Sequence, residues 1–446
     1  MKNLGIMPTV TFFISLFLLI IIFLNLGELT DNDSIGYQYF LKPDIQYADF
    51  YPSERPFIFP LYLFLIKNIG ICTSLPVYLI SNYILYCLSL CLLVIIVQKT
   101  TQSVFLAFIS FILGFFNLQI VQHINYLNPE ILLSFLVILH VYLLYNFYKK
   151  GSFFILFLIQ VSYFLLTFTK PIFFLYPFIN LPFILMTNRK FWKEQSCVIN
   201  KTKKLFLVSI CFLVLYLIPI HLWSLRNFMK NKIYSFSLIR ETNLTGKIMQ
   251  YGLIDKFPLD EQYSQLREAL TKNGNYKDIY WRFPLIIEAT PKDKNTFQFL
   301  GEFNEQVIKL NYKNYILKSL TQIPIIITKI PLDKDYPYYY LNINLNQKIW
   351  IFYLIYQFLW SIISKIYLLI ILLILISSIY SILNKNFWYL SILLVWGYMI
   401  AIISFAAYDS FTRLRTPVDA LFIILFIIGL FNCYKFIQHQ TIKLSK

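Results

Sequence analysis

Residues 9–27, TVTFFISLFLLIIIFLNLG, form an apolar run, and residues 29–62, LTDNDSIGYQYFLKPDIQYADFYPSERPFIFPLY, follow it with acids, tyrosines and an arginine. A helix of about 20 apolar residues crosses a hydrocarbon core of about 30 Å. The first run is too long for a signal-peptide core, and no small-residue cleavage site follows it, so it predicts a retained first membrane span. A carboxylate at mid-bilayer costs roughly 2.5 to 3.5 kcal/mol. The acids of the second stretch are therefore expected at or beyond the membrane surface.

The composition of the chain is typical of a polytopic membrane protein. Of its 446 residues, 58% are hydrophobic and only 14% are charged, and the mean hydropathy is +0.62. Apolar runs of membrane length predict an all-α protein with about ten transmembrane helices. The expected spans are approximately 9–27, 74–97, 103–121, 129–147, 153–169, 171–187, 205–223, 364–383, 387–407 and 418–434.

The lysines and arginines indicate the orientation of these spans. They gather in the N-terminus, in alternate short loops and in the C-terminal tail, and short cytoplasmic loops carry such an excess. We therefore expect an integral membrane protein, in a bacterial inner (plasma) membrane, with both termini cytoplasmic. This bias accounts for much of the net charge of +17, so we expect membrane lipids and no nucleic acid as partners.

Three regions follow from this topology. Residues 1–223 are expected to form an N-terminal transmembrane catalytic module that includes a first outer loop at 28–73. Residues 224–348 are more polar and predict a folded non-cytoplasmic insert, in which FNEQVIKLNYKNYILKSLTQIP (303–324) has the pattern of an amphipathic helix. Residues 349–446 are expected to hold the C-terminal transmembrane helices, and whether 349–362 form a further span is left open. Phe57–Ile69 is short and apolar, which favours a helix lying in the membrane interface.

Charged and polar residues are expected to meet on the outer side of the bilayer. The candidates are Asp33, Tyr37, Arg55, Glu130, Lys170, Arg226, Arg413 and Arg415. Acids and bases converging on one face predict a polar cavity for an anionic substrate held in the membrane. His123 is the histidine expected in a short outer turn. No glycine-rich phosphate loop or GxSxG sequence occurs, so nucleotide hydrolysis and serine-hydrolase chemistry have no support.

The order of these pieces resembles the GT-C superfamily of membrane glycosyltransferases, in particular bacterial relatives of protein O-mannosyltransferases (family 39-like) and of lipid A aminoarabinose transferases. An acid and a tyrosine follow the first span (Asp33 and Tyr37), and RPFIFPLY enters the next apolar segment. Glu130 opens a later span in YLNPEILLSFL, and LTFTKPIFFLYP, WSLRNFMKN and RLRTPVDALFII complete the series. Two departures are Lys170, where arginine is common, and Asn32, which separates Asp31 from Asp33.

The resemblance implies an inverting glycosyltransferase that moves a sugar from a polyprenyl-phosphate donor to a hydroxyl of a glycan, lipid or protein acceptor. Asp33 is then expected to act as general base, a role worth about 10²- to 10⁴-fold in rate. Glu130 is the second catalytic candidate, to orient the acceptor or help hold a divalent cation, and the need for a cation is left open. Tyr37 is expected to bind substrate. The cations expected near the lipid phosphate are Arg55, Lys170, Arg226, Arg413 and Arg415.

Other classes of protein share parts of this pattern. A polysaccharide polymerase or ligase also uses lipid-linked glycans, but we would expect its key arginines mainly in large outer loops. A transporter would need polar or broken helices at mid-membrane, usually in matching halves, and the sequence shows neither. A non-catalytic membrane protein stays open, because only an activity assay separates it from an enzyme.

Overall fold

The computed structural model of the chain describes most, but not all, of its residues. The described residues are 6–23, 56–69, 76–121, 123–188, 191, 201–254, 263–271, 279, 282–328, 358–359, 361–362, 365, 367–408 and 411–444. These residues form helices joined by turns, and no β-strand occurs among them. The outer-loop candidates Asp33, Tyr37 and Arg55, and most of the 349–362 segment, lie outside the described residues.

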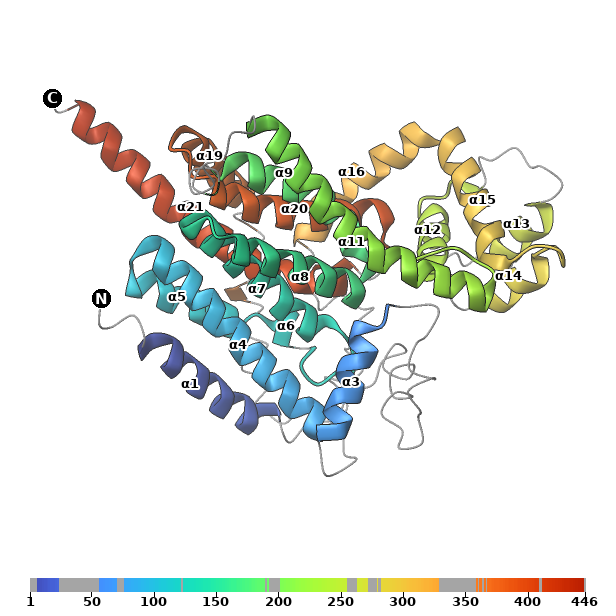
Figure 1. Ribbon diagram of the computed structural model, residues 1–446, viewed down its shortest axis with the longest axis horizontal. Coiled ribbons are helices and arrows are strands. Elements are labelled where there is room, and N and C mark those ends of the chain that lie inside the picture. The colour runs from blue at the N-terminus through green and yellow to red at the C-terminus, as the bar shows by residue number, and fades with distance from the viewer. Residues whose placement is uncertain are drawn as a thin grey trace.

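The helices fall into a bundle and a separate group (Figure 1). The bundle helices are α1 (Ile6–Phe23), α3 (Ile58–Ile69), α4 (Pro76–Thr101), α5 (Val104–Phe115), α6 (Leu118–Val121), α7 (Glu130–Lys150), α8 (Phe153–Thr169), the 3-10 turn η5 (Pro171–Phe173), α9 (Tyr176–Thr187), α11 (Lys201–Asn231), α19 (Tyr367–Leu383), α20 (Phe387–Ala406) and α21 (Phe411–Leu444). The separate group is α12 (Ile239–Gln250), α13 (Ser264–Thr271), α14 (Phe283–Ala289), α15 (Thr296–Leu310) and α16 (Tyr312–Thr328).

Several of the bundle helices have the length and composition of membrane spans. Among the described residues, five helices are long and apolar enough to cross a bilayer, namely Val77–Thr101, Glu130–Lys150, Phe206–Lys230, Phe387–Ala406 and Arg413–Gln438. Further apolar helices, including α1, α5, α8, α9 and α19, are shorter. The predicted class, an all-helical integral membrane protein, is confirmed, while the number of about ten spans stays a prediction.

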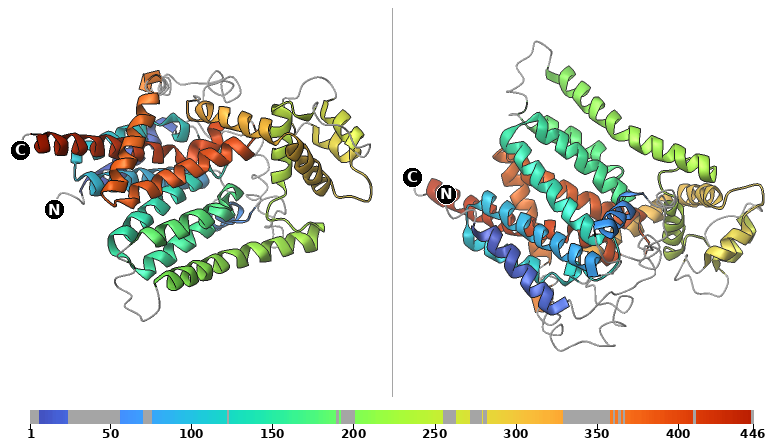
Figure 2. Two further views of the ribbon diagram at one scale, coloured as in Figure 1. Left: turned by 90° about the horizontal axis from the view of Figure 1, so that it is seen from above. Right: turned by 60° about the horizontal axis from the view of Figure 1, so that its bottom comes forward.

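Helices α7 and α21 lie at the centre of the bundle. Helix α7 packs against α4, α8, α20 and α21, and α21 packs against α4, α5, α19 and α20 as well. Both termini lie at one end of the bundle and the group α12–α15 lies at the other, as Figures 1 and 2 show. The chain therefore has two distinct ends, and the side of the membrane that each one faces stays a prediction.

The group at the far end has a hydrophobic core of its own. Leu266, Phe299, Phe303 and other apolar side chains from α12 to α15 are fully buried in it. Helix α11 continues to Asn231 without a break at residue 223, where the predicted catalytic module ends. Helix α16 leaves the group along α20, and the Tyr251 hydroxyl donates to the backbone carbonyl of Ser404 at 3.3 Å. These contacts tie the insert to the bundle.

A buried segment with little regular structure lies between α5 and α7. The predicted span at 103–121 is wrong as one continuous helix, because α5 ends at Phe115 and only the short α6 follows. Buried backbone groups of an irregular segment need partners, and α4 supplies them. The Tyr78 hydroxyl donates to the Tyr126 carbonyl at 2.9 Å, and the Asn82 amide donates to the Ile124 carbonyl at 2.9 Å.

Two further helix boundaries differ from the predictions. The amphipathic segment at 303–324 is not one helix, since Asn311 ends α15 and its side-chain amide donates to the carbonyl of Val307 at 3.1 Å. The predicted start of the last span at residue 418 is also wrong, because α21 already begins at Phe411 and contains Pro417. Proline removes one helix hydrogen bond, but ion pairs and hydrogen bonds of Arg413, Arg415 and Thr416 hold the first turns in place.

The contact between α12 and Tyr408, which follows the end of α20, leaves no space at Gly246. A Cβ atom there would lie 2.6 Å from Cγ of the Tyr408 ring. We expect Gly246→Ala to lower the apparent melting temperature in detergent, because overpacking costs about 1 to 3 kcal/mol. Gly301→Ala on α15 is the matched control, since its nearest neighbour would be 3.5 Å away and alanine favours the helix by about 1 kcal/mol. Equal melting temperatures for the two variants would contradict the close contact.

Candidate functional site

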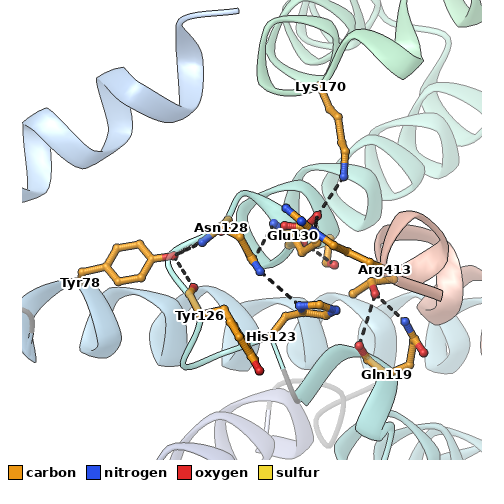
Figure 3. Close-up of polar contacts among 10 residues, drawn as sticks. Tyr78, Gln119, His123, Tyr126, Asn128, Glu130, Lys170 and Arg413 are labelled. Carbon is orange, nitrogen blue, oxygen red and sulfur yellow. Dashed lines mark hydrogen bonds and ion pairs between the residues drawn. The ribbon is translucent and has the colours of Figure 1, made fainter. Parts of the chain in front are cut away.

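Three of the predicted site residues meet at the carboxylate of Glu130. Its Oε1 atom lies 2.9 Å from Nζ of Lys170 and 2.7 Å from Nε of Arg413 (Figure 3). The Glu130 side chain is fully buried, while those of Lys170 and Arg413 are 17% and 10% exposed. One buried acid is therefore shared by two cations, which are the more exposed members of the cluster.

The three residues come from the ends of three helices. Glu130 is the first residue of α7, where the positive end of the helix dipole favours a carboxylate. Lys170 is the extended residue after α8, where a cation is also favoured. Arg413 lies in the first turn of α21, where the dipole disfavours a cation by roughly 0.3 to 1 kcal/mol. Its ion pair with Glu130 offsets this placement.

The segment before α7 completes the cluster with neutral polar groups. The Asn128 side-chain amide donates to Nδ1 of His123 at 3.2 Å, and the Asn128 backbone is bonded to the Tyr78 hydroxyl. On the other side, the Gln119 amide donates to the hydroxyl of Thr416 at 2.7 Å. The 119–130 segment is thereby held between α4 and α21 (Figure 3).

His123 is an uncharged member of this cluster. It is 1% exposed, and burial lowers its pKa from 6.5 to about 3. The nearby carboxylate of Glu130 raises the pKa, whereas Arg413 and Lys170 lower it. The imidazole is therefore neutral at physiological pH, and it can donate or accept a hydrogen bond without adding charge.

Arg415 lies away from Glu130, although it is two residues from Arg413. Its Nε atom is 2.8 Å from Oδ1 of Asp419, four residues later on α21. Its guanidinium also donates to the carbonyls of Ile326 and Ile327, the latter at 2.9 Å. These are carbonyls of the last turn of α16, which lack helical partners. The contacts give Arg415 a role in fastening α16 to α21, and its predicted contact with a phosphate stays a prediction.

Arg226 lies on α11 beside a group of aromatic side chains. Its guanidinium is 4.8 Å from the centroid of the Trp223 ring and donates to Oδ1 of Asn227 at 2.8 Å. The Trp223 ring contacts Phe57 and Phe168, with centroids 5.3 and 6.3 Å apart. Phe168 precedes Lys170 by two residues, so this aromatic group adjoins the segment that carries Lys170.

The polar residues that support the cluster are not among the site residues predicted from the sequence. Tyr78, Asn82 and Tyr83 share one face of α4 and bond to the buried segment, as Asn128 does from within it. A signal was present: two asparagines and a histidine occur in HINYLNPE, directly before a membrane-length run. Polar side chains in an apolar setting need hydrogen-bond partners, but the spacing of these residues does not show which partners they have.

The described residues give no separate support for a metal ion. Within this part of the chain, no group of three or more His, Cys, Asp or Glu side chains is arranged to hold one. Two cations already occupy Oε1 of Glu130. The divalent cation left open by the sequence therefore gains no site from the residues described.

Comparisons with protein-family models, with curated proteins and with solved structures find no match for this chain. The resemblance to membrane glycosyltransferases therefore depends on the motifs in the sequence.

Glu130 is expected to contribute more to stability than either of its cationic partners. Glu130→Gln leaves Lys170 and Arg413 without their shared counter-charge, and removing one side of a buried ion pair costs about 3 to 5 kcal/mol. Lys170→Met should cost less, because Glu130 keeps Arg413. Apparent melting temperatures in detergent measure the difference. A larger loss for Lys170→Met would contradict the central position of Glu130.

His123 is expected to make the fold sensitive to acid. Its folded-state pKa of about 3 lies below the unfolded value of 6.5, so the unfolded chain binds a proton first as the pH falls. Stability is full above the unfolded pKa and should decline by about 1.4 kcal/mol per pH unit between the two values. Thermal unfolding at about pH 7.5 and about pH 5.5 tests this. His123→Gln should show a smaller loss on acidification, and an unchanged loss would assign the acid sensitivity to other groups.

Proposed function

We propose that this chain is an inverting membrane glycosyltransferase that moves a sugar from a polyprenyl-phosphate donor to an acceptor hydroxyl. The observation that carries the proposal is the Glu130–Lys170–Arg413 cluster, in which two cations share one oxygen of a buried carboxylate. The motifs quoted from the sequence supply the reaction class. The cluster supplies a physical reason for binding the phosphate of such a donor.

The charge of the cluster suits a lipid-linked phosphodiester. Two cations stand beside one carboxylate in the cluster, and a polyprenyl-phosphate sugar carries one negative charge. As the glycosidic bond breaks, the leaving phosphate gains negative charge, and fixed cations stabilise that state. The exposed fractions of Lys170 and Arg413 leave part of each side chain accessible. Arginine can bind phosphate oxygens with two parallel N–H groups, while lysine acts as a point charge.

Glu130 fits a positioning role better than acid–base chemistry. Both cations contact its Oε1 atom, and this arrangement stabilises the carboxylate and opposes proton uptake. We infer that Glu130 fixes the geometry of Lys170 and Arg413, so that they are already in place when the phosphate arrives. Preorganised charges of this kind need no rearrangement during the reaction.

The general base is proposed to be Asp33, in the outer loop that ends at α3. Phe57, at the end of this loop, contacts the rings of Phe168 and Trp223, with centroids 5.2 and 5.3 Å apart. Those rings adjoin Lys170 and Arg226 in the sequence. The end of the loop therefore lies near the residues proposed to bind the donor, which supports a shared site. Arg55 is two residues from Phe57 and is proposed to contribute to the same anion site, with Tyr37 on the sugar.

A polysaccharide polymerase or ligase remains the alternative enzyme class. Its key arginines would be expected in large outer loops, whereas Arg413 and Lys170 lie at helix ends. The proposed location is a membrane of the cell envelope, with both termini cytoplasmic and the insert on the opposite side.

Asp33→Asn is expected to reduce sugar transfer by about 10²- to 10⁴-fold, because it removes the base while keeping the side-chain size. The assay is transfer or release of labelled sugar from polyprenyl-phosphate donors by the purified chain in lipid nanodiscs. Asp31→Asn is the matched control, since it changes another acid of the same loop and should retain turnover. Equal losses in both variants would remove Asp33 as the specific base. Turnover of an oligosaccharide-linked pyrophosphate lipid alone would favour a polymerase or ligase.

A further inference from the structure

Two complementary atoms in the cluster have no hydrogen-bond partner among the described residues. They are Nε2 of His123 and Oε2 of Glu130, and both are buried. Burying one such atom without a partner is unfavourable, and these two occur in side chains that influence each other electrostatically. Figure 3 shows both side chains in the same cluster beside Arg413. The pair therefore calls for an explanation.

The hydrogen bonds of Asn128 determine which atom of His123 carries the proton. Oδ1 of Asn128 faces the backbone N–H of Glu130 at 3.4 Å, which orients the amide so that its Nδ2 points to His123. An amide nitrogen only donates, so Nδ1 of His123 must accept. Because burial keeps the imidazole neutral, its single proton is on Nε2. The buried Nε2–H is therefore a donor, and Oε2 of the Glu130 carboxylate is an acceptor.

One kind of ligand group satisfies both atoms at once. A hydroxyl oxygen accepts a hydrogen bond from one neighbour and donates its own proton to another. A bare phosphate oxygen can only accept, and it would be repelled by the carboxylate. A cation would be repelled by Nε2–H. The chemistry of the two atoms therefore selects an O–H group over an anion or a metal ion.

We propose that His123 and Glu130 together form a single-oxygen site for an O–H group, with Nε2–H donating to the oxygen and Oε2 accepting its proton. The group is either an ordered water or a hydroxyl of the bound sugar substrate. In the second case the inference rests on the proposed function, and it separates the cluster into two parts. Oε1 of Glu130 holds the phosphate-binding cations, while Oε2 of Glu130 and Nε2 of His123 bind a hydroxyl group.

This division gives His123 a positioning role in the proposed reaction. Phosphate contacts are common to every lipid-phosphate donor and cannot distinguish the sugar. A hydroxyl bound by a buried donor and acceptor can, because a substrate that lacks it leaves both atoms unpaired. The site would then help to select the sugar, and the tautomer fixed by Asn128 would be a condition for that selection.

The direct test is a high-resolution structure of the native chain in nanodiscs, with polyprenyl phosphate alone and with a polyprenyl-phosphate hexose or pentose. An oxygen at hydrogen-bond distance from both atoms, about 2.7 to 3.2 Å, is expected. Its presence with the sugar-free lipid identifies a water, and its presence only with the sugar-linked lipid identifies a substrate hydroxyl. A direct His123–Glu130 hydrogen bond, or no shared oxygen in either state, would overturn the proposal.

Two isosteric variants test the functional part. His123→Gln can keep a donor near the position of Nε2, whereas the shorter amide of His123→Asn reaches only the position of Nδ1. If a sugar hydroxyl binds, sugar-linked lipid should bind about 3- to 10-fold more weakly to His123→Asn than to His123→Gln, while sugar-free polyprenyl phosphate binds both equally. Equal binding of the sugar-linked lipid to both variants would exclude the hydroxyl contact.

The same lipid-binding measurements distinguish a failure of this proposal from a failure of the proposed function. Failure of sugar-free polyprenyl phosphate to bind the native chain, or unchanged binding to Lys170→Met, would count against the phosphate site. The oxygen between His123 and Glu130 would still be judged by the structure alone.

Discussion

The carboxylate of Glu130 joins three helices at one end of the bundle. It begins α7 and contacts the cations that follow α8 and open α21. A buried ion pair gains little net stability, because desolvation opposes its Coulombic attraction, yet removing one partner is costly. The arrangement therefore acts mainly as a constraint on geometry. It fixes where α8 ends and α21 begins, and it holds both cations beside one carboxylate.

The position of Glu130 depends in turn on the buried segment before it. An irregular stretch inside a membrane protein is stable only where its backbone polar groups have partners. Tyr78, Asn82 and Tyr83 of α4 provide them from one helical face, and Gln119 bonds to Thr416 on α21. This framework leaves His123 and Asn128 beside the carboxylate. A polar site is thus built from neutral side chains that, taken singly, would be read as ordinary packing.

The two arginines at the start of α21 do different work. Arg413 contacts Glu130, while Arg415 contacts Asp419 and the carbonyls that end α16. Helix α16 connects the insert to the bundle. The start of α21 is therefore bonded to Glu130 through Arg413 and to the end of α16 through Arg415. This continuity gives the insert a mechanical connection to the candidate site, even though its own core is separate.

The amino-acid sequence determined the class of fold, because membrane-length apolar runs leave few alternatives to helices. It also identified Glu130, Lys170 and Arg413 as site candidates, because charged residues beside spans are costly and often have a function. It could not pair them, because residues 130 and 413 meet only through the packing of α7 against α21. Nor could it separate Arg413 from Arg415, which look equivalent in RLRTP. Tertiary contacts decided that distinction, the break after Phe115 and the position of the proton on His123. Each of these features depends on a hydrogen-bond partner that is distant in the sequence or that a buried turn holds in place.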